Sequence, residues 1–275
     1  MRLFRWWFLW AVLFNVISWA SSDLPHVVQS ALSQVSEGHV GIIYTDLETN
    51  QTFSYQADRL FNPASVIKIP ILIALYKEVE MNRISLSDRL TLEASDIQGG
   101  AGRIRYHQLG RQYTIKELAR YMIVHSDNTA TKMIIRHLTP PVLNQWFKRW
   151  GMNNTRLRTS NLLSKTSTND MSPIDVHSLL MKVVRYDVLS PIHTAEVLSF
   201  LNQQKYKWGI PAQLPSRVHV YNKTGTLTAI RHDVGLVIDR QKAYILTVFT
   251  EQFRSQLESS AFIADISKRV LEWRE

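Results

Sequence analysis

Strand patterns stand at both ends of the 275-residue chain, and helical patterns fill the region between them. Residues 38–47 and 52–55 are rich in β-branched and aromatic side chains, and so are residues 218–228, 233–238 and 243–250. We therefore predict one antiparallel sheet assembled from the two ends, with an all-α lobe inserted in it. The junction of sheet and lobe is the natural place for a functional cleft.

The helical segments begin with clear signals. Thr114 and Glu117 form a capping-box pattern before an apolar-periodic stretch. Further helices are expected over residues 24–35, 128–137, 140–150, 173–183, 191–201 and 255–273. Another begins near Ser65, and Pro70 falls in its first turn, where a missing amide hydrogen bond costs least.

The first twenty residues have the character of a secretory signal. Arg2 and Arg5 precede an apolar run, and small residues cluster around Ala20. We predict a signal peptide over residues 1–20, which makes the protein exported, periplasmic or extracellular. The alternatives are an uncleaved anchor, which would give membrane association through this segment alone, and a buried N-terminal helix. The catalytic domain is expected over residues 21–275, with an α/β lobe at about 21–57 and 210–275 and an α lobe at about 58–209.

Composition narrows the classes of partner and chemistry. There is no cysteine, which excludes a thiol nucleophile, and a large core makes disulfides unnecessary. The formal net charge is +9, but the basic residues are scattered and not interleaved with aromatics, so we predict no nucleic-acid partner. Anionic wall polymers or lipid head groups fit better, and a solvated basic surface without a partner fits equally well. We expect a monomer that uses no cofactor and no metal.

Three short motifs carry the chemistry: Ser65-x-x-Lys68, Ser126-Asp127-Asn128 and Lys223-Thr224-Gly225. In this order they describe a serine acyl-transfer site with a lysine base. Residues i and i+3 share a helix face, so Lys68 would lie beside Ser65. An ammonium cannot take the serine proton, so Lys68 must lose its own proton, and burial and a neighbouring cation both lower a lysine pKa.

The second motif is expected to handle the leaving group. Ser126 would relay a proton between Lys68 and the leaving nitrogen, and Asn128 would donate to the substrate amide. Asp127 would hold the loop in shape. The alternative is that Asp127 or Asn128 is only the N-cap of the next helix.

The third motif lies on a predicted strand. Gly225 removes a side chain and lets another backbone approach. The backbone amides of Ser65 and Thr226 would form the oxyanion hole. Lys223, Thr224, Thr226 and Arg231 would form a cationic, hydroxyl-rich wall for a carboxylate, although Arg231 could also be a solvated hairpin charge.

These motifs resemble those of the penicillin-recognising serine enzymes, which are the penicillin-binding proteins and the serine β-lactamases. Their order and separations resemble the class A β-lactamase branch over nearly all of the mature chain. The resemblance implies a β-lactamase/transpeptidase-like fold of one α/β and one α lobe. It also implies an acyl-enzyme on Ser65, formed with β-lactams or D-Ala-D-Ala peptides. Arg231 stands where many class A enzymes have an arginine that binds the substrate carboxylate.

One departure from that family is visible. Class A β-lactamases carry a glutamate, on a loop after the second motif, that directs the deacylating water. Residues 155–165 contain no Glu or Asp, and Asn161 is the nearest polar candidate. Asp170 and Asp175 lie nearer the next helix, where capping or solvation is favoured. Loss of a general base costs about 10²–10⁴-fold in the step it serves, so acylation should be facile and β-lactam hydrolysis slow.

The sequence thus favours an exported serine hydrolase similar to a D,D-peptidase, whose partner is a β-lactam or a peptidoglycan peptide. The first alternative is a functional class A-type β-lactamase. The second is a sensor or penicillin trap without turnover. A basic wall-binding or nucleic-acid-binding protein with a vestigial site is disfavoured by the intact set of motif residues.

Overall fold

The computed structural model describes residues 25–164 and 168–274, and a five-stranded antiparallel sheet stands at its centre. The strand order is β2-β1-β7-β6-β5. β1 pairs with β7 from His39 opposite Glu251 to Asp46 opposite Tyr244, so the first and last strands are neighbours. The strands are β1 (His39–Asp46), β2 (Thr52–Tyr55), β5 (His219–Leu227), β6 (Ile230–Asp239) and β7 (Lys242–Glu251).

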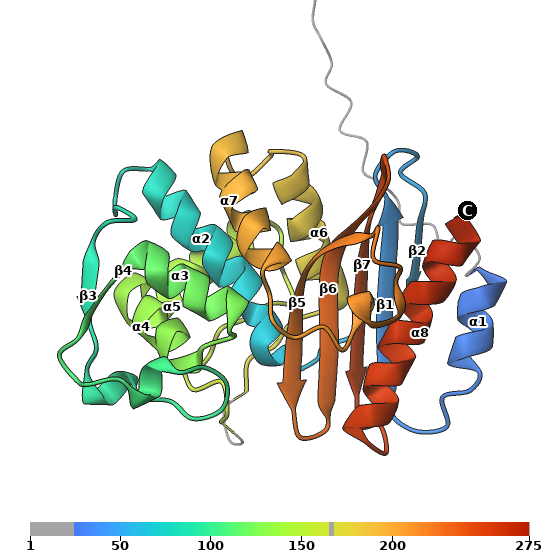
Figure 1. Cartoon of the computed structure of the whole chain (residues 1–275), viewed down its shortest axis with the longest axis horizontal. Helices are drawn as coiled ribbons and strands as arrows, with labels where there is room; N and C mark the ends of the chain where they lie inside the picture. The colour runs from blue at the N-terminus through green and yellow to red at the C-terminus, as the bar shows by residue number, and fades with distance from the viewer. Residues whose placement is uncertain (1–24, 165–167, 275) are drawn as a thin grey trace, which may run out of the picture.

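Helices cover both faces of this sheet (Figure 1). On one face lie α8 (Gln256–Arg274) and the short α1 (His26–Leu32), over an apolar cluster to which all of these elements contribute. On the other face lies α6 (Pro173–Val184). The buried ring of His177 lies within hydrogen-bond distance of Thr45 on β1 and Thr247 on β7, which fixes α6 to the sheet.

The helical lobe packs around one central helix. Ten of the thirteen residues of α2 (Lys68–Glu80) are buried, so this helix is enclosed on all sides. Its neighbours are α3 (Ile115–Val124), α4 (Asn128–Leu138), α5 (Pro140–Arg149) and α7 (Pro191–Asn202). A small hairpin of β3 (Arg89–Thr91) and β4 (Gln112–Thr114) lies at the outer end of the lobe (Figure 1). Four short 3₁₀ turns complete the structure: η1 (Ala64–Ile67), η2 (Ala94–Asp96), η3 (Ile104–Tyr106) and η4 (Ile210–Gln213).

The predicted fold class is confirmed: an antiparallel sheet from both ends of the chain with an inserted helical region. The capping box is present, because Thr114 Oγ1 accepts from Glu117 N while the Glu117 carboxylate accepts from Thr114 N. The β3–β4 hairpin was not predicted, since three-residue strands carry too little periodicity. Residues 1–20, the predicted signal, lie outside the described residues. No helix within 25–164 and 168–274 has the length and apolar character needed to span a bilayer.

Candidate active site

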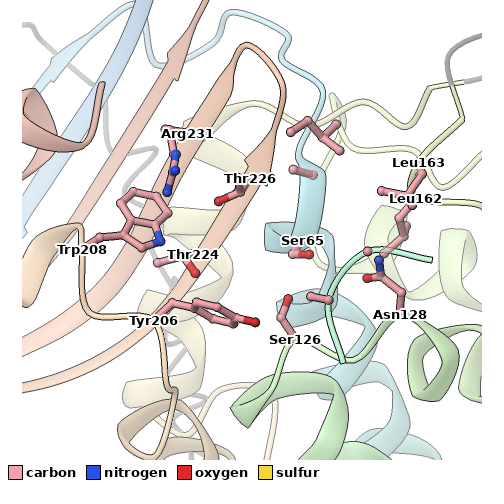
Figure 2. Close-up of a pocket in the computed structure, with 14 residues that line it drawn as sticks. Ser65, Ser126, Asn128, Leu162, Leu163, Tyr206, Trp208, Thr224, Thr226 and Arg231 are labelled. Atoms are coloured by element: carbon pink, nitrogen blue, oxygen red, sulfur yellow. The ribbon is translucent and has the colours of Figure 1, made fainter. Parts of the chain in front are cut away.

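A cleft of about 460 Å³ opens between the helical lobe and the edge strand β5 (Figure 2). It is lined by residues from all three motifs, from the β5–β6 hairpin and from three connecting segments. These residues are Ala64, Ser65, Gly100, Ala101, Ser126, Asn128, Leu162, Leu163, Tyr206, Trp208, Thr224, Thr226, Leu227 and Arg231.

Ser65 is presented by a strained turn rather than by the α-helix that was predicted to carry it. It lies in η1, directly before α2, and the preceding Ala64 has φ +46°, a conformation that costs a non-glycine residue free energy. Asn62 supports this turn, since its Oδ1 accepts from Ala64 N at 3.1 Å. The buried ring of His232 accepts from Thr250 N through Nδ1, which leaves Nε2 to donate to Asn62 O at 2.9 Å. Strand β6 thereby anchors the nucleophile turn.

Lys68 is fully buried under the cleft, and its ammonium has three partners. Nζ donates to Ser126 O at 2.7 Å and to Asn128 Oδ1 at 2.7 Å, and it lies 3.1 Å from Ser126 Oγ. Among the described residues no hydrogen bond joins Lys68 to Ser65, so the predicted pairing is not formed in this state. Burial, and next the charge of Lys223, holds the pKa of Lys68 well below its ordinary value, while Asp127 opposes the shift. A neutral Lys68 is what a base for Ser65 requires.

Ser126 joins the two lysines. Its Oγ lies 3.1 Å from Lys68 Nζ and accepts from Lys223 Nζ at 3.0 Å. With Lys68 neutral, two of its partners are carbonyl oxygens that can only accept, so its lone pair is left for a hydroxyl proton. The three side chains form a continuous hydrogen-bonded path from Lys223 through Ser126 to Lys68, and Ser126 thus stands where the predicted relay between Lys68 and the leaving nitrogen would require it.

Lys223 is fully buried on β5, and Nζ also donates to Thr224 O at 2.8 Å. Burial lowers the pKa of Lys223 to about 7, and the carboxylate of Asp233 opposes that shift. Asp233 is itself buried, which raises the pKa of its carboxyl to about 7, and it accepts from Asn222 Nδ2 and from Ile210 N. Asp233, a residue outside the three motifs, therefore counteracts the effect of burial on the charge of Lys223.

Gly225 allows β5 to lie directly against the nucleophile turn. A Cβ on this residue would lie 2.9 Å from Pro63 O and 3.3 Å from Ala64 Cβ. No larger residue fits without moving one backbone away from the other. Ser65 and Thr226, whose amides are predicted to form the oxyanion hole, each follow one of these closely packed segments and line the same cleft.

The residues predicted to bind a carboxylate lie together on β5 and β6, and the ring of Trp208, which the sequence did not reveal as a neighbour, packs against Arg231. The Arg231 guanidinium lies 4.3 Å from the ring centre of Trp208, and Nη2 donates to Gln256 Oε1 at 2.7 Å. Burial lowers the pKa of Arg231. Thr224, Thr226 and Arg231 all line the cleft (Figure 2), so Arg231 is part of the site and not a solvated hairpin charge.

Asp127 of the second motif both caps a helix and holds the loop, so the two structural interpretations of this residue apply together. Asp127 is the N-cap of α4, accepting from Ala130 N, and its Oδ2 also accepts from Arg103 N at 2.7 Å and Ile104 N at 2.9 Å. It thus holds the loop, as predicted. The Asn128 amide is fixed between Lys68 and Gly99 O, the latter at 2.9 Å, while facing the cleft.

The loop after the second motif places leucines, not a polar group, at the cleft. Leu162 and Leu163 line it, whereas Asn161 does not. Asn161 Oδ1 accepts from Leu163 N at 3.1 Å, and its side chain contacts the Gln98 amide at 2.7 Å. The expectation that Asn161 is the nearest candidate is therefore wrong: a turn within the loop holds its exposed side chain against Leu163 N and the Gln98 amide, and the leucines face the cleft instead.

The two carboxylates farther along the chain are engaged elsewhere. Asp170 pairs with Arg158, and Asp175 accepts from Asn154 N and Thr155 Oγ1 at 2.8 Å each. No Asp or Glu is among the fourteen residues that line the cleft in the described structure.

Sequence reasoning missed one wall of the cleft, formed by the segment between α7 and η4. Gln204 Nε2 contacts Thr224 Oγ1 at 3.4 Å, and Tyr206 and Trp208 line the cleft. The alternation of these three residues was the only available signal, and it is too short to identify a strand or a wall.

Comparison with known proteins gives a consistent result. The model of the beta-lactamase enzyme family matches residues 24–273. The chain is 24% identical to beta-lactamase OXY-2 of Klebsiella oxytoca over 264 residues, covering 92% of this chain and 91% of that protein. A solved structure of PBP-A matches with a TM-score of 0.87 at 30% identity, covering 92% of this chain and 97% of that one. An acyl-enzyme complex of a leucine-to-glutamate PBP-A mutant with penicillin G matches with a TM-score of 0.86 at 29% identity, covering 90% and 94%.

Proposed function

The chain belongs to the beta-lactamase enzyme family and is a class A-type serine hydrolase, and from this we propose that its substrates acylate Ser65. We further propose that the acyl-enzyme formed with a β-lactam is hydrolysed slowly. D-Ala-D-Ala peptides are the proposed turnover substrates, so the activity is that of a D,D-peptidase. One observation carries this proposal: the loop after the second motif places Leu162 and Leu163 at the cleft, and neither can act as a base for water.

The acylation step uses the groups already described. Neutral Lys68 takes the proton of Ser65 as Oγ bonds to the substrate carbonyl carbon. The carbonyl oxygen becomes an oxyanion between the amides of Ser65 and Thr226. The carbon–nitrogen bond then breaks, and the proton returns through Ser126 to the leaving nitrogen. Throughout, the substrate carboxylate is held by the Lys223 side of the cleft.

Deacylation separates the two substrate classes. The opened β-lactam stays attached to the acyl group, so its leaving nitrogen continues to occupy the space beside Ser126. Water would then have to approach from the Leu162 side, where no group can take its proton. A peptide leaving group departs instead, which frees Ser126 and Lys68 to activate water on their own side.

Two similarities support the acylation step. PBP-A is similar over most of the chain, and the mutant of that protein was solved as an acyl-enzyme with penicillin G. A second candidate function, β-lactam hydrolysis, is favoured by the names of the curated relatives, which are beta-lactamases such as OXY-2. The missing loop carboxylate supports the first candidate. We also propose that the protein is exported, on the basis of the residue pattern over 1–20.

The decisive experiment follows the mass of residues 21–275 after mixing with benzylpenicillin. We expect a stoichiometric adduct that persists, its absence in the Ser65→Ala variant, and release of D-Ala from an acyl-D-Ala-D-Ala peptide. Rapid loss of the adduct with turnover of penicillin would establish the second candidate instead.

A pair of matched variants tests the loop argument. Leu162→Glu places a carboxylate at the cleft and should raise the deacylation rate by about 10²–10⁴-fold. Leu162→Gln has nearly the same shape but no base, and it should leave deacylation slow. Equal rates for the two variants would mean that the missing base is not what limits deacylation.

A further inference from the structure

The segment from Gln204 to Trp208 presents two different surfaces. Tyr206 and Trp208 line the cleft, the buried Gln204 contacts Thr224 behind it, and Tyr206 stands across the cleft from Ser126 (Figure 2). Lys205 and Lys207 alternate with them and are exposed. The same short segment therefore supplies one wall of the cleft and positive charge just outside that wall.

Lys205 is brought to the end of α3 by a backbone contact, in which its N–H donates to Val124 O at 3.0 Å. This places it beside His125, the residue before Ser126. Burial, and then the charges of Arg120, Lys205 and Arg103, lowers the pKa of His125. Hydrogen bonds bring the other two cations to the same place: Arg120 Nη2 donates to Gln203 Oε1 at 3.0 Å, two residues before Lys205, and Arg103 N donates to Asp127 Oδ2 at 2.7 Å, two residues after His125. We call Arg103, Arg120 and Lys205 the cationic rim.

Nothing on the described surface neutralises the cationic rim. All three side chains are exposed, and none forms an ion pair within residues 25–164 and 168–274. Asp127, the one carboxylate that acts on His125 in the opposite sense, is buried and accepts three backbone N–H groups. Gathered cations repel one another, and beside a cleft they raise the local concentration of anions.

The relay fixes which half of a substrate would meet the cationic rim. The leaving nitrogen must reach Ser126 Oγ to receive its proton, and the α-carboxylate of the leaving residue is held beside Lys223 and Thr224. The rest of that residue then lies between Ser126 and Tyr206. The residues that precede Ser126 and Tyr206 in the sequence are His125 and Lys205, so the cationic rim is adjacent to this gap.

We infer that the cationic rim is a subsite for the leaving half of the substrate, and that it takes an amino acid or peptide with a negative charge beyond its α-carboxylate. The inference rests on the proposed function, since it refines which peptide amides are cleaved. The reaction is the same hydrolysis: the amide carbon–nitrogen bond breaks, water supplies the hydroxyl of the acid, and the leaving amine takes the proton. Only the amine differs, being more anionic than D-alanine.

The test compares two peptides with the same acyl half, one ending in D-Ala-D-Ala and the other in D-Ala-D-Glu. The wild type should prefer the D-Glu peptide in kcat/KM, and added salt should reduce the preference. An exposed ion pair contributes about 0.2–1 kcal/mol, so the double variant Arg103→Ala/Lys205→Ala, which removes two cations, should lose about two- to thirtyfold in kcat/KM on the D-Glu peptide. The D-Ala peptide should change less than twofold.

The matched control is Lys148→Ala/Arg149→Ala, which removes the same charge from the exposed face of α5, outside the cleft. It should leave the peptide preference intact. A wild type without preference, or an equal loss in the control, would overturn the inference.

A binding measurement separates the inference from the proposed function. The Ser65→Ala variant cannot be acylated, so its Kd for the two peptides needs no turnover. Tighter binding of the D-Glu peptide, lost in the Arg103→Ala/Lys205→Ala background, would support the subsite even if neither peptide is hydrolysed. Equal Kd values would overturn it even if the peptidase activity is real.

Discussion

The charge on Lys223 should set an alkaline limit on the capture of substrates that carry a carboxylate. Burial lowers the pKa of this lysine to about 7, and the Asp233 carboxylate keeps it from falling further. Below that pH the ammonium is present and attracts the carboxylate. Above it the proton is lost, and with it the attraction, so the acylation rate should fall as pH rises through 7.

The size of the effect follows from the pKa. A group with a pKa of about 7 is about 0.9 charged at pH 6, about 0.5 at pH 7 and about 0.1 at pH 8. If only the charged form captures substrate, kcat/KM for acylation falls about fivefold from pH 7 to pH 8 and about tenfold per unit beyond. Asp233→Asn removes the negative charge that keeps the pKa of Lys223 from falling further, so the alkaline fall in the acylation rate should occur at lower pH. The Asn222 amide can adapt to this change, because its Oδ1 has no partner in the described structure.

The assay is stopped-flow acylation by a penicillin and by the methyl ester of the same penicillin, from pH 6 to pH 9. The ester has no carboxylate, so its acylation rate should fall much less as the pH rises. Thermal unfolding of Asp233→Asn checks that the fold is retained. The reasoning fails if the rate of acylation by the penicillin does not fall between pH 6 and pH 9, or if the rate with the ester falls equally. It also fails if Asp233→Asn moves the fall in rate to higher pH.

Three further perturbations test other parts of the site. Asp127→Ala leaves three backbone N–H groups without their acceptor, at about 1–3 kcal/mol each, so calorimetry should show a loss of roughly 3–9 kcal/mol in the free energy of unfolding. A loss below about 1 kcal/mol would contradict the assigned role. Trp208→Ala removes the ring beneath Arg231, which is worth about 0.5–2 kcal/mol, so KM for carboxylate substrates should rise about two- to thirtyfold, while Trp208→Phe keeps most of the affinity. Gly225→Ala forces β5 away from Pro63 O, and acylation should fall at least about 100-fold, the cost of a lost oxyanion donor, with a much smaller change in urea unfolding.

The fold could be predicted because its signals are local and agree with one another. Alternating strands, proline-initiated helices and the capping box at Thr114 each specify an element within a few residues. Their order along the chain leaves few ways to bury the apolar faces. The three motifs could be predicted for the same reason, since each is short and contiguous.

The walls between the motifs depend on contacts between distant segments. Tyr206 and Trp208 face the cleft because the backbone of Lys205 bonds to Val124, about eighty residues earlier. The side chain of Asn161 is turned away from the cleft by its contacts with Leu163 and Gln98, and no hydrophobic periodicity predicts such a turn. Sequence spacing also placed Lys68 beside Ser65, but burial under the second motif gave its nitrogen nearer partners in Ser126 and Asn128.

The pairing of β1 with β7 has a consequence for the order of folding. Strands that are partners across some two hundred residues cannot meet until almost the whole chain is available, and such distant pairings form late. Strand β5, which carries Lys223, joins the sheet through β6, so the helical lobe can collapse around α2 well before the cleft exists. Reaction of Ser65 with a labelled penicillin should therefore serve as a clock for the last stage of refolding, appearing after the helical signal is complete.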